Sequence, residues 1–307
     1  MRYVSTRGAA PVLEFNDVLL EGLASDGGLY VPEAWPKFSD SGTGDYLETA
    51  IEVMTPFISP SIPQNIFEEI VADTYSTFRH EEIVPLVDMG QGMYLLELFH
   101  GPTLAFKDVA LQLVGKLFEY ELGRRDKKVT IVGATSGDTG SAAIDACKEF
   151  SAIKSFILIP DGNMSEIQRK QMTTVNKSNV FPILASGTFD DCQDVVKKGF
   201  KDRSFLKDSQ YLLAVNSINW VRIIGQICYY FYAALKANEF SKPLNFSVPT
   251  GNFGNVFACY AASKMGMPLS KIIVAVNSND ILHRFFKDND YSKNEVSETI
   301  SPSMDIS

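Results

Sequence analysis

The sequence predicts an α/β protein whose strands form parallel sheets. From about residue 94 onward, short apolar runs rich in β-forming residues recur along the chain, and amphipathic helical stretches separate most of them. Strands that alternate with helices pair in parallel through right-handed crossovers. The predicted strands are residues 129–132, 156–159, 180–184, 212–215, 246–248 and 272–276.

Residues 1–93 are predicted to be an N-terminal helical part that packs on the larger of two lobes. Helical periodicity covers residues 17–23, 46–58 and 66–78, and loops rich in Ser, Pro and Gly interrupt it. Residues 94–215 then form the smaller α/β lobe, and residues 216–307 form the larger one. Within the smaller lobe, Ser165 and Gln168 have the spacing of a capping box, which predicts a helix start.

Composition excludes several classes of function. A chain of 307 residues that is 45% hydrophobic and 21% charged is typical of a globular protein with a large core. Its net charge of -9 argues against a general nucleic-acid or anionic-membrane binder. Any anionic ligand must therefore be held by local donors, such as helix N-termini and backbone amides.

The cysteines and histidines indicate neither disulfides nor a metal site. No CxxC pair occurs among the four cysteines, which are Cys147, Cys192, Cys228 and Cys259. We expect reduced thiols in or near the core, and no metal, because the three histidines show no ligand spacing with them. The N-terminus lacks the apolar segment of a signal peptide, and the longest apolar stretch, residues 223–235, is too short to span a bilayer. We therefore expect a cytoplasmic protein.

Lys107 is a candidate nucleophile. It lies in residues 100–108, HGPTLAFKD, behind a Gly-Pro turn and among apolar neighbours. A desolvated lysine side chain loses its proton more easily, and its neutral amine can attack carbonyl groups. The alternative is an ordinary surface charge, which is the usual state of lysine.

Two glycine-rich turns follow predicted strands, where α/β proteins collect ligands. In the first, GATSGDTGS at residues 133–141, hydroxyl groups precede a helix and suit a carboxylate or phosphate; the alternative is a capped helix start. In the second, PTGNFGN at residues 249–255, Gly251 and Gly254 let backbone amides converge on a dianion; the alternative is plain loop geometry. The second turn is not a Walker motif, since no Lys-Ser/Thr follows Gly254, so it favours a small phosphate ester over a nucleotide.

A nucleophilic lysine together with a phosphate-binding turn implies pyridoxal 5'-phosphate. The chain resembles the threonine synthase family, whose members are pyridoxal-phosphate enzymes of fold type II. The matching stretches run in order along nearly the whole chain. They are residues 25–32 (SDGGLYVP), 100–108, 133–141, 168–174 (QRKQMTT), 215–220 (VNSINW) with Arg222, and 249–255.

The resemblance implies a role for each matched position. Lys107 would hold the cofactor as an internal aldimine and act as general base and acid. The cofactor phosphate would be held by Gly251, Asn252, Phe253, Gly254 and Asn255. The substrate would be held by Thr135, Ser136, Asp138, Thr139, Asn216 and Ser217. Asn219, Arg169 and Lys170 lie in family-like segments near the substrate, although a solvated helix face is the alternative for the two cations. His100 is expected to be structural.

The implied reaction converts O-phospho-L-homoserine and water to L-threonine and phosphate, which is the work of a carbon–oxygen lyase in threonine biosynthesis. Two alternatives remain open: another fold type II lyase or dehydratase that acts on hydroxy or phospho amino acids, or a non-catalytic homologue that binds pyridoxal phosphate. The expected partner is a small-molecule substrate, without nucleic acid or membrane, and the assembly is a monomer or homodimer.

The family resemblance also implies that members of the family are longer than this chain. Members continue well past the stretch at residues 301–306, SPSMDI, so the larger lobe is expected to be incomplete. The Ser or Thr that meets the pyridine nitrogen would lie in the missing part. We therefore expect weakened or absent turnover from the 307-residue chain.

Overall fold

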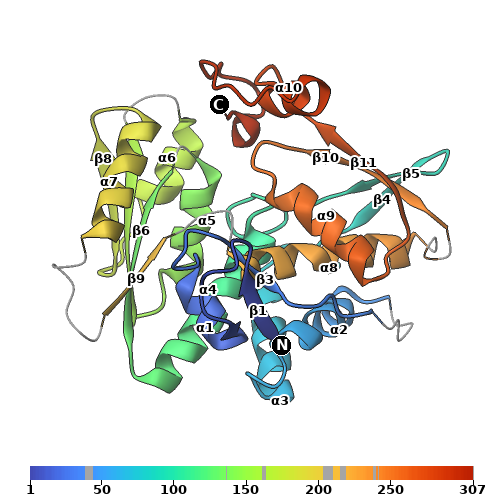
Figure 1. The fold of residues 1–307 in the computed structure, drawn as a ribbon, viewed down its shortest axis with the longest axis horizontal. Coiled ribbons are helices and arrows are strands. Elements are labelled where there is room, and N and C mark those ends of the chain that lie inside the picture. The colour runs from blue at the N-terminus through green and yellow to red at the C-terminus, as the bar shows by residue number, and fades with distance from the viewer. Residues whose placement is uncertain are drawn as a thin grey trace.

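Two parallel sheets lie on opposite sides of a helical centre in the computed structural model (Figure 1). The structure describes residues 1–38, 44–135, 137–160, 164–202, 210–214, 219–237, 240 and 242–306. A four-stranded sheet and its helices occupy one side of the view, and a two-stranded sheet occupies the other. The predicted α/β class with parallel sheets in two lobes is confirmed.

The N-terminal part contains the three predicted helices, α1 (Phe15–Glu21), α2 (Tyr46–Ile58) and α3 (Gln64–Tyr75). It also contains a small antiparallel sheet that the sequence did not predict. Its strands are β1 (Arg2–Ser5), β2 (Leu13–Glu14) and β3 (Tyr30–Pro32), in the order β2-β1-β3. Strands of this length are too short to show a clear alternation of apolar and polar residues.

Asp26 holds the loop of the SDGGLYVP stretch. Its carboxylate accepts hydrogen bonds from Ser5 Oγ at 2.7 Å, from Gly28 N at 2.8 Å, and from the amides of Ala9 and Ala10, each at 2.9 Å. Desolvation acts to raise the pKa of Asp26, but these donors outweigh it and lower the pKa to about 2. A Cβ at Gly28 would lie 2.3 Å from Ser5 Oγ, so the loop also requires glycine there. This stretch is therefore a structural motif.

The four-stranded sheet consists of β6 (Lys128–Ala134), β7 (Ile153–Pro160), β8 (Val180–Ala185) and β9 (Gln210–Ala214). All neighbouring strands are parallel, and their order is β8-β7-β6-β9. The helices between them are α5 (Asp138–Cys147), α6 (Glu166–Thr173) and α7 (Phe189–Lys201). The chain leaves β6 toward β7 and later returns to pair β9 on the other side of β6. The end of β6 is therefore the topological switch point of the sheet.

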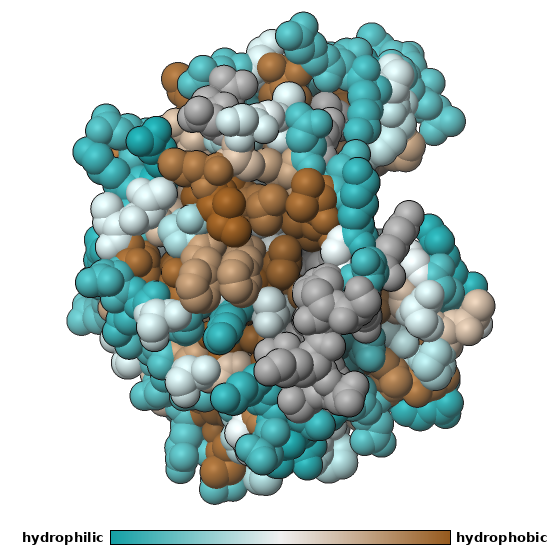
Figure 2. Space-filling model, turned by 90° about the vertical axis from the view of Figure 1, so that its left-hand side faces the viewer, coloured by the Kyte–Doolittle hydropathy of each residue, from teal (hydrophilic) through white to brown (hydrophobic). Residues whose placement is uncertain are grey.

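The edge strand β8 exposes apolar side chains. Phe181, Ile183 and Leu184 are 37%, 42% and 52% exposed. Apolar residues gather on the side of the molecule that carries this sheet (Figure 2). Pro182 lies within β8 and cannot donate a hydrogen bond, which limits further pairing at this edge.

The second part of the chain is built around a two-stranded parallel sheet, β10 (Leu244–Pro249) and β11 (Leu269–Ala275). It also contains α8 (Trp220–Lys236), α9 (Gly254–Met265), α10 (Ile281–Asp288) and a short 3-10 helix, η1 (Pro302–Met304). An antiparallel hairpin, β4 (Leu86–Gly90) and β5 (Met93–Leu96), was not predicted. Most of its residues are exposed, although β5 is an apolar run, Met-Tyr-Leu-Leu, so burial does not mark this hairpin as it marks the parallel strands.

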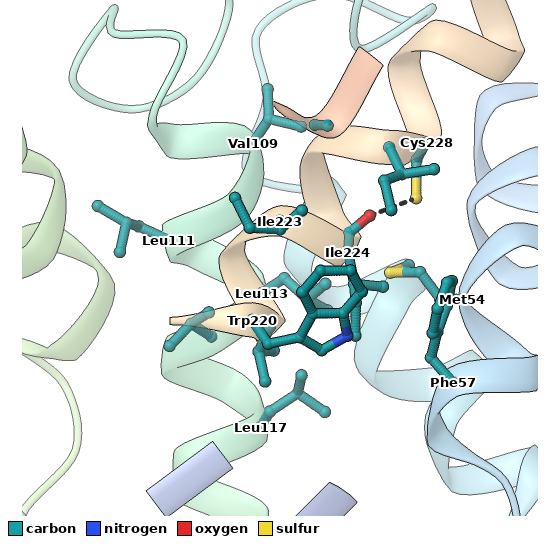
Figure 3. Packing of buried hydrophobic residues seen from close by; sticks show 14 of the residues in the cluster. Met54, Phe57, Val109, Leu111, Leu113, Leu117, Trp220, Ile223, Ile224 and Cys228 are labelled. Carbon is teal, nitrogen blue, oxygen red and sulfur yellow. Dashed lines mark hydrogen bonds between the residues drawn. The ribbon is translucent and has the colours of Figure 1, made fainter. Parts of the chain in front are cut away.

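Helix α8 forms the centre of the core. Every residue from Trp220 to Ala234 is buried. Trp220, Ile223 and Ile224 lie between α2 and α4 (Asp108–Arg125), where Leu113 and Phe57 are fully buried (Figure 3). Truncating such a side chain to alanine typically costs about 2–5 kcal/mol. The long apolar stretch of the sequence is thus this core helix.

The four cysteines are buried and free, and no helix among the described residues is long and apolar enough to cross a membrane.

Substituting Asp26 with Asn is expected to lower the thermal unfolding temperature at neutral pH, because a neutral amide holds its four donors less well. The lowered pKa means that this stabilisation is present above the ordinary value of 3.8 and is lost as pH falls through about 2. The difference between wild type and variant, measured by thermal unfolding, should therefore shrink below pH 4. Asp126→Asn, at a left-handed helix end that suits Asn, is the control. A pH-independent difference would contradict the prediction.

Candidate active site

The loop before α4 positions Lys107. Asp108 Oδ2 accepts a hydrogen bond from Thr103 N at 2.8 Å, and Asp108 Oδ1 accepts one from Thr103 Oγ1 at 2.7 Å. A Cβ at Gly101 would lie 2.4 Å from Asp108 Cβ, so the loop packs tightly on this carboxyl. Burial raises the pKa of Asp108 to about 6, although the Thr103 donors oppose the rise. The loop thereby holds Lys107 at the N-cap position of α4.

The side chain of Lys107 is buried and paired. The residue is 6% exposed, and its Nζ donates to Asp138 Oδ1 at 2.5 Å. Burial lowers the pKa of Lys107 below its ordinary value, although the attraction of Asp138 opposes this effect. The interpretation of Lys107 as a surface charge is therefore wrong. Its amine is a buried group whose proton is more easily lost than that of a solvated lysine.

The turn after β6 carries Asp138 at the start of α5. Burial acts to raise the pKa of Asp138, but the charge and hydrogen bond of Lys107 outweigh it, so the pKa lies below its ordinary value. Thr135 Oγ1 accepts hydrogen bonds from Gly137 N at 3.1 Å and Gly140 N at 3.0 Å, and it donates to Gly137 O. Of the two interpretations of this turn, the capped helix start therefore applies to Thr135, whose hydroxyl caps the start of α5. Thr139 is half-buried, and Ser136 lies outside the described residues.

The turn between β10 and α9 carries the residues expected to hold phosphate. Gly251 is buried, Asn252 and Phe253 are exposed, Gly254 is half-buried, and Asn255 is buried. Asn255 Oδ1 accepts hydrogen bonds from the hydroxyls of Tyr229 and Tyr230, so this oxygen anchors the turn to α8. Phe253, the N-cap residue of α9, provides no side-chain hydrogen bond to the first turn of this helix, which begins at Gly254. The amides at such a helix start can bind an anion.

Helix η1 contacts both turns. Ser303 Oγ donates to Asp138 Oδ2 at 2.7 Å. A Cβ at Gly251 would lie 2.9 Å from Met304 Cα, so Met304 packs directly on the second turn. Sequence reasoning assigned no role to Ser303 or Met304, because neither lies in a glycine-rich turn or beside a reactive residue in the chain. Their contacts join two turns that lie more than 100 positions apart in sequence.

Arg222 adds a second buried cation. It lies on α8, is 3% exposed, and has a pKa lowered to about 10 by burial, against the opposing charge of Asp138. Its charge also contributes to lowering the pKa values of Lys107 and Asp138. Arg222 therefore adds positive charge to the buried pair of Lys107 and Asp138, and positive charge favours an anionic ligand.

The remaining predicted residues have mostly structural contacts. His100 Nε2 forms a hydrogen bond with Glu97 Oε2 at 2.7 Å. Arg169 and Lys170 are exposed on α6, where Lys170 pairs with Glu166. Asn219 caps α8 by accepting from Val221 N. Asn216 and Ser217 lie outside the described residues, among which no cluster of metal-binding side chains occurs.

The whole chain has known relatives. Residues 2–75 match the family described as threonine synthase N terminus, and residues 82–307 match the pyridoxal-phosphate dependent enzyme family. Threonine synthase from Pseudomonas aeruginosa is 53% identical over 311 residues. The crystal structure of pyridoxal-phosphate-bound threonine synthase from Brucella melitensis superposes with a TM-score of 0.93 at 49% identity, covering 99% of this chain and 67% of that one. This chain belongs to the threonine synthase family.

These matches confirm the predicted resemblance. The relatives are longer than this chain, so the matches include only part of each relative. The chain spans 66% of the Pseudomonas threonine synthase, and all of this chain is matched. Threonine synthase from Saccharomyces cerevisiae is 45% identical, with 99% of this chain and 63% of the yeast protein covered. The chain thus corresponds to about two thirds of the length of these threonine synthases.

The site fits the cofactor for which the wider enzyme family is named. Pyridoxal phosphate needs an amine for its aldehyde and donors for its phosphate. Lys107 provides a buried amine, and the uncapped start of α9 provides amides beside Gly251. Met304 packs against Gly251 so closely that a side chain at position 251 would collide with it. The buried amine and the amides of this turn are therefore groups of the kind that this cofactor requires.

Replacing Asp138 with Asn is expected to lower the pKa of Lys107 further. The carboxylate is the group that favours the charged lysine, while burial and Arg222 act against it. The midpoint for acetylation of Lys107 by acetic anhydride, followed against pH by peptide mass spectrometry, should fall by roughly one pH unit or more. Lys116, which pairs with Asp73 in the same samples, provides the internal control. An unchanged or higher midpoint for Lys107 would refute the assignment.

Proposed function

We propose that this protein is a threonine synthase that binds pyridoxal 5'-phosphate and converts O-phospho-L-homoserine and water to L-threonine and phosphate. The observation that carries the proposal is the buried amine of Lys107, which pairs with Asp138 beside the same η1 segment that packs on the second glycine-rich turn. Membership of the threonine synthase family supports the same reaction.

The proposed role of Lys107 is to bind the cofactor aldehyde and to move protons at the α- and β-carbons of the substrate. Pyridoxal phosphate, when bound, supplies an electron sink for negative charge that develops on the substrate carbons. Burial lowers the pKa of Lys107 below its ordinary value, which favours the neutral amine that can accept a proton. Asp138 would keep Nζ in place through its hydrogen bond and stabilise the charged form after proton uptake.

The turn formed by residues 251–255 would hold the cofactor phosphate. The amides at the start of α9 and the helix dipole both favour a dianion. Asn252 is exposed at this turn and is free of the core contacts that occupy Asn255. We therefore assign the backbone amides of Gly251, Phe253 and Gly254 and the side chain of Asn252 to phosphate binding, and a supporting role to the side chain of Asn255.

The substrate is proposed to lie over the first turn, near Asp138 and Thr139, with Ser136, Asn216 and Ser217 as further contacts. Thr135 would act through the turn that it caps rather than through a free hydroxyl. Arg222 contributes positive potential, which an anionic substrate needs in a protein with a net charge of -9.

The remaining assignments follow from this function. We propose a small-molecule substrate, a place in threonine biosynthesis and a cytoplasmic location, which four buried free thiols support. The divisions near residues 93 and 215, the fold type II assignment and an assembly as monomer or homodimer stay predictions.

Borohydride reduction of the protein mixed with pyridoxal phosphate is expected to attach the cofactor to Lys107, because its amine is the buried nucleophile of the site. Peptide mass spectrometry locates the label, and visible absorbance follows binding. Lys107→Ala should lose both signals. Lys116→Ala, which removes a partly exposed lysine on the same helix, should retain them. Label spread evenly over surface lysines would contradict the proposal.

Activity is tested by incubating the protein with O-phospho-L-homoserine and pyridoxal phosphate and measuring phosphate and threonine together. Lys107→Ala should reduce the rate by about a hundredfold to ten-thousandfold, the usual contribution of a positioned proton-transfer group. Equal amounts of threonine and phosphate are expected. Formation of a keto acid and ammonia would identify another lyase of the wider enzyme family.

A further inference from the structure

Asp138 has a different partner on each carboxylate oxygen. Lys107 Nζ donates to Oδ1 at 2.5 Å, and Ser303 Oγ donates to Oδ2 at 2.7 Å. The two donors come from segments that lie 31 and 165 positions away in the chain. Ser303 has no place in the reaction as proposed above, yet it contacts the one carboxylate that pairs with the reactive lysine.

The position of Ser303 is determined by a polar network around Asp305. Asp305 Oδ1 accepts hydrogen bonds from Asn277 Nδ2 at 2.7 Å, Asn279 Nδ2 at 3.0 Å and Thr299 Oγ1 at 2.7 Å. Its Oδ2 accepts from Thr299 N at 3.0 Å. Asn277 and Asn279 follow the end of β11, so the network ties the segment that carries Ser303 to the two-stranded sheet.

Met304 provides a second contact for the same segment. Its Cα would lie 2.9 Å from a Cβ at Gly251, so Ser303 and Met304 contact the first and second glycine-rich turns respectively. Because adjacent residues make these two contacts, the orientation of the Ser303 hydroxyl depends on both parallel sheets.

A second donor changes how strongly Asp138 retains the proton of Lys107. When Lys107 becomes neutral, a carboxylate without another donor would remain as a buried, poorly compensated charge. A charge-assisted hydrogen bond from a hydroxyl stabilises that carboxylate most when the lysine is neutral, and it thereby lowers the cost of losing the lysine proton. Arg222 of α8 is a further charged group that acts on this pair, and it also favours the neutral lysine.

We propose that Ser303 is a positioning residue: its hydroxyl orients and stabilises Asp138 so that Lys107 can release its proton within the buried site. The catalytic meaning of this role rests on the proposed function, whereas the effect on Lys107 is a property of the chain itself. Asp305 has the supporting role of anchoring the segment that delivers the hydroxyl.

The proposal is tested with the chain in the absence of added cofactor. Acetylation of Lys107 by acetic anhydride is followed from about pH 6 to pH 11 by peptide mass spectrometry, because only the neutral amine reacts. Ser303→Ala should raise the midpoint by roughly half a pH unit to one unit, since Asp138 then depends on Lys107 alone. Ser303→Thr keeps the hydroxyl and should restore the wild-type midpoint.

Ser301→Ala is the matched control. Ser301 lies in the same segment and accepts a hydrogen bond from Asn277 at 2.9 Å, but Asp138 has no contact with it among the described hydrogen bonds. Its midpoint should equal that of wild type. Asp305→Ala should raise the midpoint as Ser303→Ala does, because the segment loses its anchor.

An unchanged midpoint in Ser303→Ala, an equal rise in Ser301→Ala, or a rise that Ser303→Thr does not reverse would overturn the role of Ser303. A wild-type midpoint in Asp305→Ala would overturn the anchoring role. Borohydride trapping of pyridoxal phosphate on the same samples tests the proposed function separately. Failure to trap the cofactor at Lys107 would reject that function while leaving the acetylation result to decide the role of Ser303.

Discussion

The buried pair of Lys107 and Asp138 is the interaction on which the rest of the site depends. Removing two charges from water costs several kcal/mol for each ion, so such a pair persists only where further polar contacts compensate. Here Ser303 donates to the second carboxylate oxygen, and Arg222 adds a positive charge close to the pair. Lys107 lies at the start of α4 and Asp138 at the start of α5, and these two helices pack together. The pair therefore links helix packing directly to the protonation state of the reactive amine.

The topology explains why the site lies where it does. The strand order β8-β7-β6-β9 leaves the carboxyl end of β6 at a point where the neighbouring connections diverge, and the turn with Asp138 occupies that point. The second turn follows β10 in the other parallel sheet, and the buried helix α8 lies beside α9 (Figure 1) and also packs against α4. Tyr229 and Tyr230 on α8 hold Asn255, while Arg222 on the same helix acts on Asp138. One core helix thus sets the placement of both turns.

The parallel strands were predictable from local pattern, whereas the antiparallel elements were not. Strands β6 and β7 are apolar runs with alternate residues deeply buried, so their composition marks them clearly. In β4 and β5 most side chains are exposed, and the turn between them depends on positive φ angles at Gly90, Gln91 and Gly92. Although β5 is apolar in sequence, such a hairpin is defined by its turn geometry and strand pairing. The strands β1, β2 and β3 were not predicted because each contains too few residues to show an apolar pattern.

The sequence by itself determined the reactive lysine, the two glycine-rich turns and the position of each turn after a strand, because each of these features depends on residues that are adjacent in the chain. The tertiary structure alone decided which groups those elements meet. In the folded chain, Lys107 pairs with Asp138, and Ser303 donates to the same carboxylate. The Thr135 hydroxyl caps α5, and the Asn255 side-chain oxygen accepts hydrogen bonds from two tyrosines. The physical reason is that a hydrogen bond between residues 165 positions apart depends on how whole helices and sheets pack, and local chain preference carries no information about that packing.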